Sequence, residues 1–195
     1  MRDYWVVFVS YIIGAFPSAY IAGRLLKGID IRKVGDRNAG AGNVSRNVGH
    51  VAGIGVLAAD IGKGALAILL AQAVASQLIV FFCGFAVVAG HNWPIFLRFK
   101  GGRGLATTIG VLLVLLTVPM AIVSAAGIIA LWRKRNLVIT GLVMFAPLPL
   151  LAWLFGASSK LILYGVALLC LAGIMHLVTT RHLSEEQKGE ALHWW

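Results

Sequence analysis

The chain has 195 residues, of which 59% are hydrophobic and 12% are charged, and 17 lysines and arginines against seven aspartates and glutamates give it a formal net charge of +10. A soluble domain holds about 45–50% apolar and about 25% charged residues, so the composition excludes an ordinary soluble protein and indicates an integral membrane protein. Two cysteines are too few for a disulfide-stapled secreted domain.

The apolar runs predict an all-α, polytopic membrane helix bundle. A crossing needs about 20 mostly apolar residues. The run 104–132 is too long for one straight helix and is interrupted at Thr117 and Pro119, so we divide it into two crossings. The other crossings are expected at residues 4–25, 51–75, 77–97, 138–155 and 159–179. This gives seven transmembrane helices in a single domain over residues 1–195; five spans with re-entrant segments are the alternative.

The basic residues predict how this bundle is oriented. Cytoplasmic loops carry an excess of lysine and arginine. Most of the 17 basic residues fall in 24–46, 98–103, 133–135 and the tail after residue 180, while the connections between them add only Lys160. We therefore expect the N-terminus outside and the C-terminus in the cytoplasm. Trp194 and Trp195 are expected to anchor the tail among lipid headgroups.

The first basic connection contains a segment rich in glycine and asparagine, GDRNAGAGNVSRNVG at residues 35–49. Glycines let successive backbone N–H groups converge, asparagines add donors, and arginine forks match phosphate oxygens. A flexible basic connector is the plainer alternative, but the segment favours an anion site. Its candidate residues are Gly35, Arg37, Asn38, Gly40, Asn43 and Arg46.

The second basic connection, FKGGRGLATT at residues 99–108, leads into a new helix at 104 or 105. The amides and positive dipole end of a helix N-terminus favour an anion, and Lys100 and Arg103 add full charge. Gly101 and Gly102 complete this second expected phosphate cradle. The spacing of a Walker A loop is absent from the segment.

A few polar residues lie within the apolar runs. Asp60 and Lys63 are three residues apart on one helical face, and we favour a structural pair near the site over direct chemistry. His91 and His176 end crossings on the basic side and can face the site. We find no catalytic triad, carboxylate pair or metal-ligand spacing, so we expect no metal. Two anion cradles would instead hold two phosphate-bearing substrates in reacting geometry.

At these positions the chain resembles the bacterial acyl-phosphate:glycerol-3-phosphate acyltransferases, the PlsY family. The similar segments are 14–20 (GAFPSAY), 30–35 (DIRKVG), 35–43 (GDRNAGAGN), 60–64 (DIGKG) and 90–107. The resemblance implies a seven-span enzyme of the bacterial inner membrane with its active site facing the cytoplasm. Such an enzyme transfers a fatty acyl group from acyl phosphate to glycerol 3-phosphate in phospholipid biosynthesis, giving lysophosphatidate and phosphate without a cofactor.

The resemblance also implies residue roles and partners. Its partners are acyl phosphate, glycerol 3-phosphate and membrane lipids, not nucleic acid, and a monomer is compatible with it. Catalytic roles fall to His176, Lys100, Asn38 and Arg46. Phosphate binding falls to Gly35, Arg37, Gly40, Asn43, Gly101, Gly102, Arg103 and His91.

The chain departs from the family pattern at several of these positions. Asp36 replaces a serine, Gly42 a threonine and Thr179 an asparagine, and Arg103 replaces a lysine. A carboxylate beside a phosphate is unfavourable unless Arg37 neutralises it, a local salt bridge that would partly cancel the change.

Two other functions stay open: a small membrane carrier of phosphate compounds, and a non-catalytic relative that binds lipid precursors. A carrier usually places its site at the membrane midplane between repeats, whereas here no repeat is visible and the basic residues gather at one face. The departures at Asp36 and Thr179 favour the non-catalytic relative.

Overall fold

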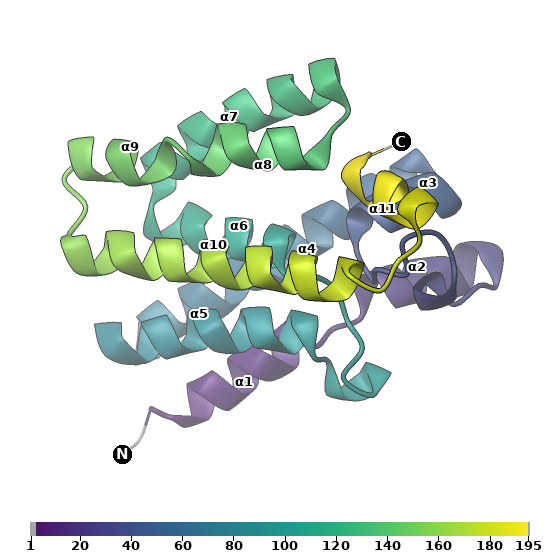
Figure 1. The fold of residues 1–195 in the computed structure, drawn as a ribbon. Helices are drawn as coiled ribbons and strands as arrows, with labels where there is room; N and C mark the ends of the chain where they lie inside the picture. Colours follow the sequence, from purple (N-terminus) through teal and green to yellow (C-terminus); the bar gives the residue numbers. More distant parts are fainter. Residues whose placement is uncertain (1–2, 195) are drawn as a thin grey trace.

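The structure is a computed structural model that describes residues 3–194, and helices dominate this range. Within it, the only β-type pairing is an isolated bridge between Asn136 and His193. The helices, in chain order, are α1 (Trp5–Gly14), α2 (Ser18–Lys27), α3 (Ala41–Asn47), α4 (His50–Val74), α5 (Gln77–Asn92), α6 (Leu105–Leu115), α7 (Thr117–Lys134), α8 (Leu137–Phe145), α9 (Leu148–Leu154), α10 (Ser159–Thr180) and α11 (Glu185–Leu192) (Figure 1). Two short 3-10 helices, η1 (Ile31–Lys33) and η2 (Ile95–Leu97), lie in the basic connections.

Six stretches of the described residues are long and apolar enough to cross a membrane: Trp5–Lys27, His50–Val74, Gln77–Leu97, Thr117–Lys134, Leu137–Leu154 and Ser159–Thr180. The expected break within residues 104–132 is confirmed, because α6 ends at Leu115 and α7 begins at Thr117, while only α7 is among the six stretches long enough to cross. With 11 residues α6 is only about 16 Å long, about half the thickness of a bilayer core.

Two expected crossings are each built from two helices. Residues 138–155 form α8 and α9, which meet at Pro147, and residues 4–25 form α1 and α2, which meet at Pro17. Proline lacks the backbone N–H that a continuous helix needs. The carbonyl of Phe16, freed by the second break, accepts a hydrogen bond from Nζ of Lys63 at 3.2 Å. Irregular backbone at membrane depth needs such internal partners.

Close helix contacts in the bundle run through glycines. α4 packs extensively on α6. A Cβ at Gly64 would collide with the backbone carbonyl of Thr107, and one at Gly110 with that of Ile61. A Cβ at Gly14 would likewise collide with the backbone carbonyl of Val87 on α5. Small residues let membrane helices approach this closely, and the positions of α4, α5 and α6 fix the connections at their ends.

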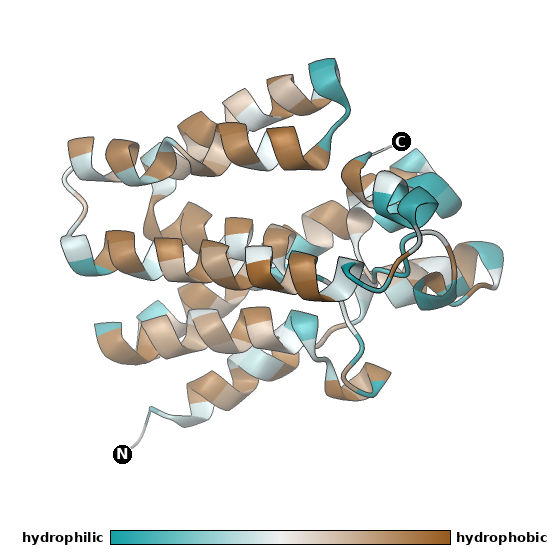
Figure 2. Ribbon diagram, in the orientation of Figure 1, coloured by the Kyte–Doolittle hydropathy of each residue, from teal (hydrophilic) through white to brown (hydrophobic). Residues whose placement is uncertain are grey.

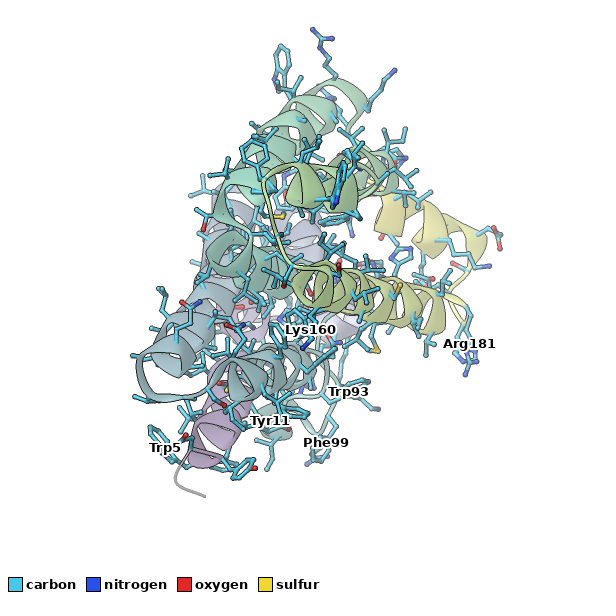
Figure 3. The ribbon with its side chains drawn as sticks, turned by 90° about the vertical axis from the view of Figure 1, so that its left-hand side faces the viewer. Trp5, Tyr11, Trp93, Phe99, Lys160 and Arg181 are labelled. Atoms are coloured by element: carbon cyan, nitrogen blue, oxygen red, sulfur yellow. The ribbon has the colours of Figure 1, made fainter. Side chains whose placement is uncertain are left out.

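Polar and apolar residues separate along the bundle. Figure 2 shows hydrophilic residues concentrated at the end that holds α2, α3 and α11, and brown helices over the rest. Large apolar side chains on the outside are exposed, among them Phe8, Trp153 and Leu163. A soluble surface rarely presents so much apolar area, but lipid tails accept it. In Figure 3, Tyr11 and Trp93 lie close together where α1 meets α5, and Oη of Tyr11 donates to the Trp93 carbonyl at 2.8 Å.

Candidate functional site

The glycine-rich connection folds around one asparagine. Asn43, on α3, is buried, and its side-chain nitrogen donates to the backbone carbonyls of Ile31, Val34 and Asn38 at 2.9, 3.1 and 3.0 Å. Its side-chain oxygen accepts from Nδ2 of Asn47 at 2.8 Å. The amide of Asn43 therefore holds the connection in place around α3, and its expected phosphate contact stays a prediction.

A buried ion-pair cluster joins the two basic connections. Asp36, which is 3% exposed, lies 3.0 Å from Nη2 of Arg46 through Oδ1 and 3.0 Å from Nη2 of Arg103 through Oδ2. Arg37, the neighbour considered as the neutralising partner of Asp36, is exposed, and Arg46 and Arg103 take that role instead. Two of the expected phosphate-site cations thus converge on one carboxylate.

The C-terminal segment completes this cluster. Nη1 of Arg46 donates to the backbone carbonyl of His193, and Nε2 of Gln187 on α11 donates to the carbonyl of Gly35 at 3.2 Å. Backbone of the tail also meets the turn between α7 and α8, where the Trp194 N–H donates to the carbonyl of Arg135 at 3.3 Å. Residues 187–194 therefore lie over the glycine-rich connection.

The last described residue is buried rather than interfacial. Trp194 is 7% exposed and packs in a small apolar core with Ile31, Val44 and Val56. The expected headgroup anchor is therefore wrong for Trp194, because the tail folds back onto α3 and takes this indole with it. Trp195, the other residue of that expected anchor, lies outside the described residues.

The second basic connection is closed onto the end of α5. The backbone N–H groups of Gly101 and Gly102 donate to the carbonyls of Asn92 and His91, each at 3.1 Å. A Cβ on Gly102 would overlap Nε2 of His91, so only glycine fits there. These two amides are engaged with protein, and Lys100 beside them is exposed. Their expected contacts with phosphate stay predictions.

Arg103 links this connection to the end of α10. Its Nε donates to Oγ1 of Thr179 at 3.1 Å, and that hydroxyl donates to the carbonyl of Met175 at 2.7 Å. His176, one residue after Met175, is half-buried and interacts electrostatically with Arg103 and Asp36. The structure thus brings His176 to the same cluster as the two arginines.

A second polar cluster lies beside the break between α1 and α2. Oδ1 of Asp60 accepts from Ser18 Oγ at 2.7 Å, lies 2.8 Å from Nζ of Lys63 and lies 3.6 Å from Nδ1 of His91. Asp60, Lys63 and His91 are all buried. A small cavity adjoins them, lined in part by Phe16, Lys63, His91, Gly101 and Gly102. Asp60 and Lys63 are therefore paired, and they support the backbone next to the site.

Charges outside the spans show how burial and pairing act on this end of the molecule. Burial lowers the pKa of Arg103, and the neighbouring Asp36 opposes that change. Hydrogen bonds from Arg32 hold the pKa of Asp30 below its ordinary value of 3.8, while Asp30 raises the pKa of Arg32. Arg32 also donates through Nη1 to the carbonyl of Leu97 at 2.9 Å, so this pair ties η1 to η2.

The expected site residues therefore form an inner and an outer group. Arg46 and Arg103 meet around Asp36, and His176 interacts electrostatically with Arg103 and Asp36, whereas Lys100 and Arg37 lie on the exposed rim. Asn38 is half-buried, and Gly40 is buried where a Cβ would press on the Asn38 amide. Sequence reasoning missed Gln187 and His193, because nothing local in the tail signals a contact with the connection. Among residues 3–194, no three His, Cys, Asp or Glu side chains are placed to hold a metal ion.

These features define an all-helical, multi-pass membrane protein with a buried arginine-rich site at the polar end of its bundle. The family model described as glycerol-3-phosphate acyltransferase matches residues 4–188. A relative named glycerol-3-phosphate acyltransferase 4, from Dehalococcoides mccartyi, is 43% identical over 176 residues, which cover 90% of this chain and 95% of the relative. The glycerol-3-phosphate acyltransferase of Alkaliphilus metalliredigens is 35% identical over 94% of this chain and 93% of its own.

Solved structures agree with these relatives. The crystal structure of PlsY, an integral membrane glycerol 3-phosphate acyltransferase, in its glycerol 3-phosphate form is 26% identical with a TM-score of 0.82. The match covers 94% of this chain and 92% of that one. The chain belongs to the glycerol-3-phosphate acyltransferase family, so the resemblance expected from its motifs is confirmed.

Proposed function

We propose that this chain is a membrane glycerol-3-phosphate acyltransferase that takes a fatty acyl group from acyl phosphate. Family membership supports this reaction. PlsY and the relatives reported above are also named as glycerol-3-phosphate acyltransferases. The observation that carries the proposal is the meeting of Arg46 and Arg103 on Asp36 at the polar end of an apolar bundle, with His176 within electrostatic range of Arg103 and Asp36. Phosphate groups bind at this end while an acyl chain lies along the apolar helices.

The reaction follows from holding two substrates together. The 1-hydroxyl of glycerol 3-phosphate attacks the acyl carbonyl carbon, the bond from that carbon to the phosphate oxygen breaks, and lysophosphatidate and phosphate form. Arginine forks stabilise negative charge on the phosphate oxygens as this bond breaks. The hydroxyl proton passes to His176 or to a substrate phosphate. Lys100 and Arg37 on the rim attract the anionic substrates.

We also propose seven crossings, with the N-terminus outside the bacterial inner membrane and the site facing the cytoplasm. The basic connections and the tail share the polar end, which agrees with a cytoplasmic location. The start of α1 and the end of α10 lie at opposite ends of the bundle in Figure 1, which suits an odd number of crossings. α6 serves as the short seventh crossing, and the whole chain acts as one domain. Labelling of single cysteines placed at Ser158 and Ser184 from outside intact cells tests this, because only Ser158→Cys should react.

The decisive experiment is an assay of the purified chain with palmitoyl phosphate and glycerol 3-phosphate. Lysophosphatidate and phosphate should form in equal amounts. We expect Arg46→Gln to lower kcat/KM by about 100-fold or more, because a guanidinium at the reacting phosphate is lost. Arg133→Gln, which removes the same charge from the exposed last turn of α7, is the matched control and should keep the wild-type rate.

A non-catalytic relative is the second candidate, because Asp36 already pairs with both inner arginines and offsets part of their charge. If that is the function, the purified chain binds glycerol 3-phosphate but releases no phosphate from palmitoyl phosphate, while an active relative assayed beside it does. Turnover by the unaltered chain excludes it.

A further inference from the structure

Asp36 places a buried carboxylate in a site built mainly from cations and backbone groups. It lies in the turn before α3, and its two oxygens face arginines from different segments: Arg46 on α3 and Arg103 before α6. A single side chain therefore joins the two basic connections. The proposed reaction does not itself need a carboxylate at this place, because the phosphates of both substrates are anions.

The two arginines need a counter-charge to lie where they do. Arg46 and Arg103 are both largely buried and interact electrostatically with one another. Two buried guanidinium groups repel, and each loses hydration. Asp36 offsets both effects, since it lies 3.0 Å from each guanidinium and is itself 3% exposed. Without its charge, the two guanidinium groups would move apart or turn toward solvent.

The pairing leaves donors available for a second anion. Nε and Nη2 of Arg46 and Nη2 of Arg103 are buried and have no hydrogen-bond partner among residues 3–194, although both Nη2 atoms lie within 3.0 Å of Asp36. Buried donors without partners are costly unless a ligand satisfies them. Asp36 thus holds both guanidinium groups by charge, while Nε of Arg46 has no hydrogen-bond partner among residues 3–194.

We propose that Asp36 is a positioning residue that sets the spacing of Arg46 and Arg103 so that together they bind a phosphate monoester. The identity of that anion rests on the proposed function. The opposite arrangement, in which the carboxylate competes with the phosphate for the two arginines, makes the contrary prediction for every measurement below.

The first experiment measures steady-state kinetics of Asp36→Asn, which keeps the shape of the side chain and removes its charge. We expect KM for glycerol 3-phosphate and the inhibition constant of inorganic phosphate to rise about tenfold or more, with kcat changed by less than about threefold. Glu186→Gln, which removes a carboxylate from the exposed surface of α11, is the control and should change neither. Lower values of either constant in Asp36→Asn overturn the proposal in favour of competition.

The second experiment asks whether Asp36 acts through Arg103. In a double-mutant cycle, Asp36→Asn should raise KM by less than about threefold once Arg103→Gln is present, because one of the two guanidinium groups whose spacing Asp36 sets is already gone. Fully additive effects overturn the proposal. So does a loss of thermal stability with unchanged KM, since that result describes a merely structural carboxylate. Asp36→Ser, with a smaller side chain, is measured beside Asp36→Asn in case the latter folds poorly.

A binding measurement separates this inference from the proposed reaction. Glycerol 3-phosphate and, separately, inorganic phosphate should raise the thermal unfolding temperature of the wild-type chain in detergent, and raise it less in Asp36→Asn. If the wild-type chain shows no turnover but this difference persists, the catalytic proposal fails and the role of Asp36 stands. Equal or greater stabilisation of Asp36→Asn overturns the role of Asp36, whatever the turnover.

Discussion

Arg46 and His193 stand 147 residues apart in the chain, and the guanidinium of the first donates to the backbone carbonyl of the second. The same guanidinium pairs with Asp36 through its other terminal nitrogen. Because α11 and the residues after it supply this contact, the tail is part of the site and not an appendage. The geometry of Arg46 therefore depends on how firmly the tail is docked.

Trp194→Ala should loosen that docking. The indole is buried among Ile31, Val44 and Val56, and removing a buried tryptophan side chain usually costs about 3–5 kcal/mol. We expect a lower unfolding temperature in detergent and a raised KM for glycerol 3-phosphate, because Arg46 loses its anchored neighbour. Trp153→Ala is the matched control, since Trp153 is 66% exposed on α9. Equal effects of the two substitutions would contradict the structure of the tail.

Gly102→Ala should impair the site by steric overlap. The added methyl group would meet the imidazole of His91 and come within 2.9 Å of the Ala39 carbonyl, so the second basic connection must shift. We expect kcat/KM to fall by about tenfold or more, since a displacement near 1 Å already costs this much in positioned reactions. Gly62→Ala on α4 has open space around it and is the control. Activity assays of both variants check the prediction; a fully active Gly102→Ala enzyme would rule out this packing.

Most of the fold could be predicted from local sequence patterns. Long apolar runs located the crossings, and Thr117 with Pro119 located the boundary between α6 and α7, because hydropathy and proline act over a few residues. The same reasoning joined α8 to α9, although Pro147 lies between them. A proline inside an apolar run is compatible with either a kink or a break, and packing against neighbouring helices decides which one forms.

The site was predictable in its composition but not in its pairings. Glycine, asparagine and arginine spacing pointed to residues 35–46 and 100–103, and these segments do meet around Asp36. The partner of Asp36 could not be predicted, because Arg37 is adjacent in sequence while Arg103 approaches only after α4 to α6 have packed. The burial of Trp194 was missed for the same reason, since the sequence of a terminal tryptophan is equally compatible with a buried side chain and with an anchor at the membrane interface.

Lys63→Met should destabilise the bundle more than a surface lysine substitution. It would leave the Asp60 carboxylate buried without its cation and remove the hydrogen bond to the Phe16 carbonyl at the α1–α2 break. Breaking a buried ion pair by removing one partner costs about 3–5 kcal/mol. Thermal unfolding in detergent measures the loss, with Lys160→Met at the exposed start of α10 as control.

The double variant Asp60→Asn with Lys63→Met separates the charge from the fold. Because both charges are then removed, we expect it to be more stable than Lys63→Met alone, although the introduced amide still needs the Ser18 hydroxyl as a donor. If the double variant is as unstable as the single one, the uncompensated carboxylate is not the cause of the loss.

The pair formed by Asp30 and Arg32 should make stability depend on pH. The carboxylate accepts from the Arg32 backbone N–H, Nε and Nη2 at 3.1, 3.0 and 2.9 Å, which keeps its pKa below the ordinary 3.8. A group whose pKa is lower in the folded state stabilises that state above its unfolded pKa and loses this contribution as the pH falls. Asp30→Asn should therefore lower the free energy of unfolding near pH 7 by about 1 kcal/mol, and the unfolding temperature should fall with it. The gap between wild type and variant should narrow as the pH drops below about 4. Thermal unfolding in detergent from pH 7 to pH 3 measures this gap, with Glu186→Gln as control; a gap that widens toward low pH would show that Arg32 does not hold the carboxylate ionised.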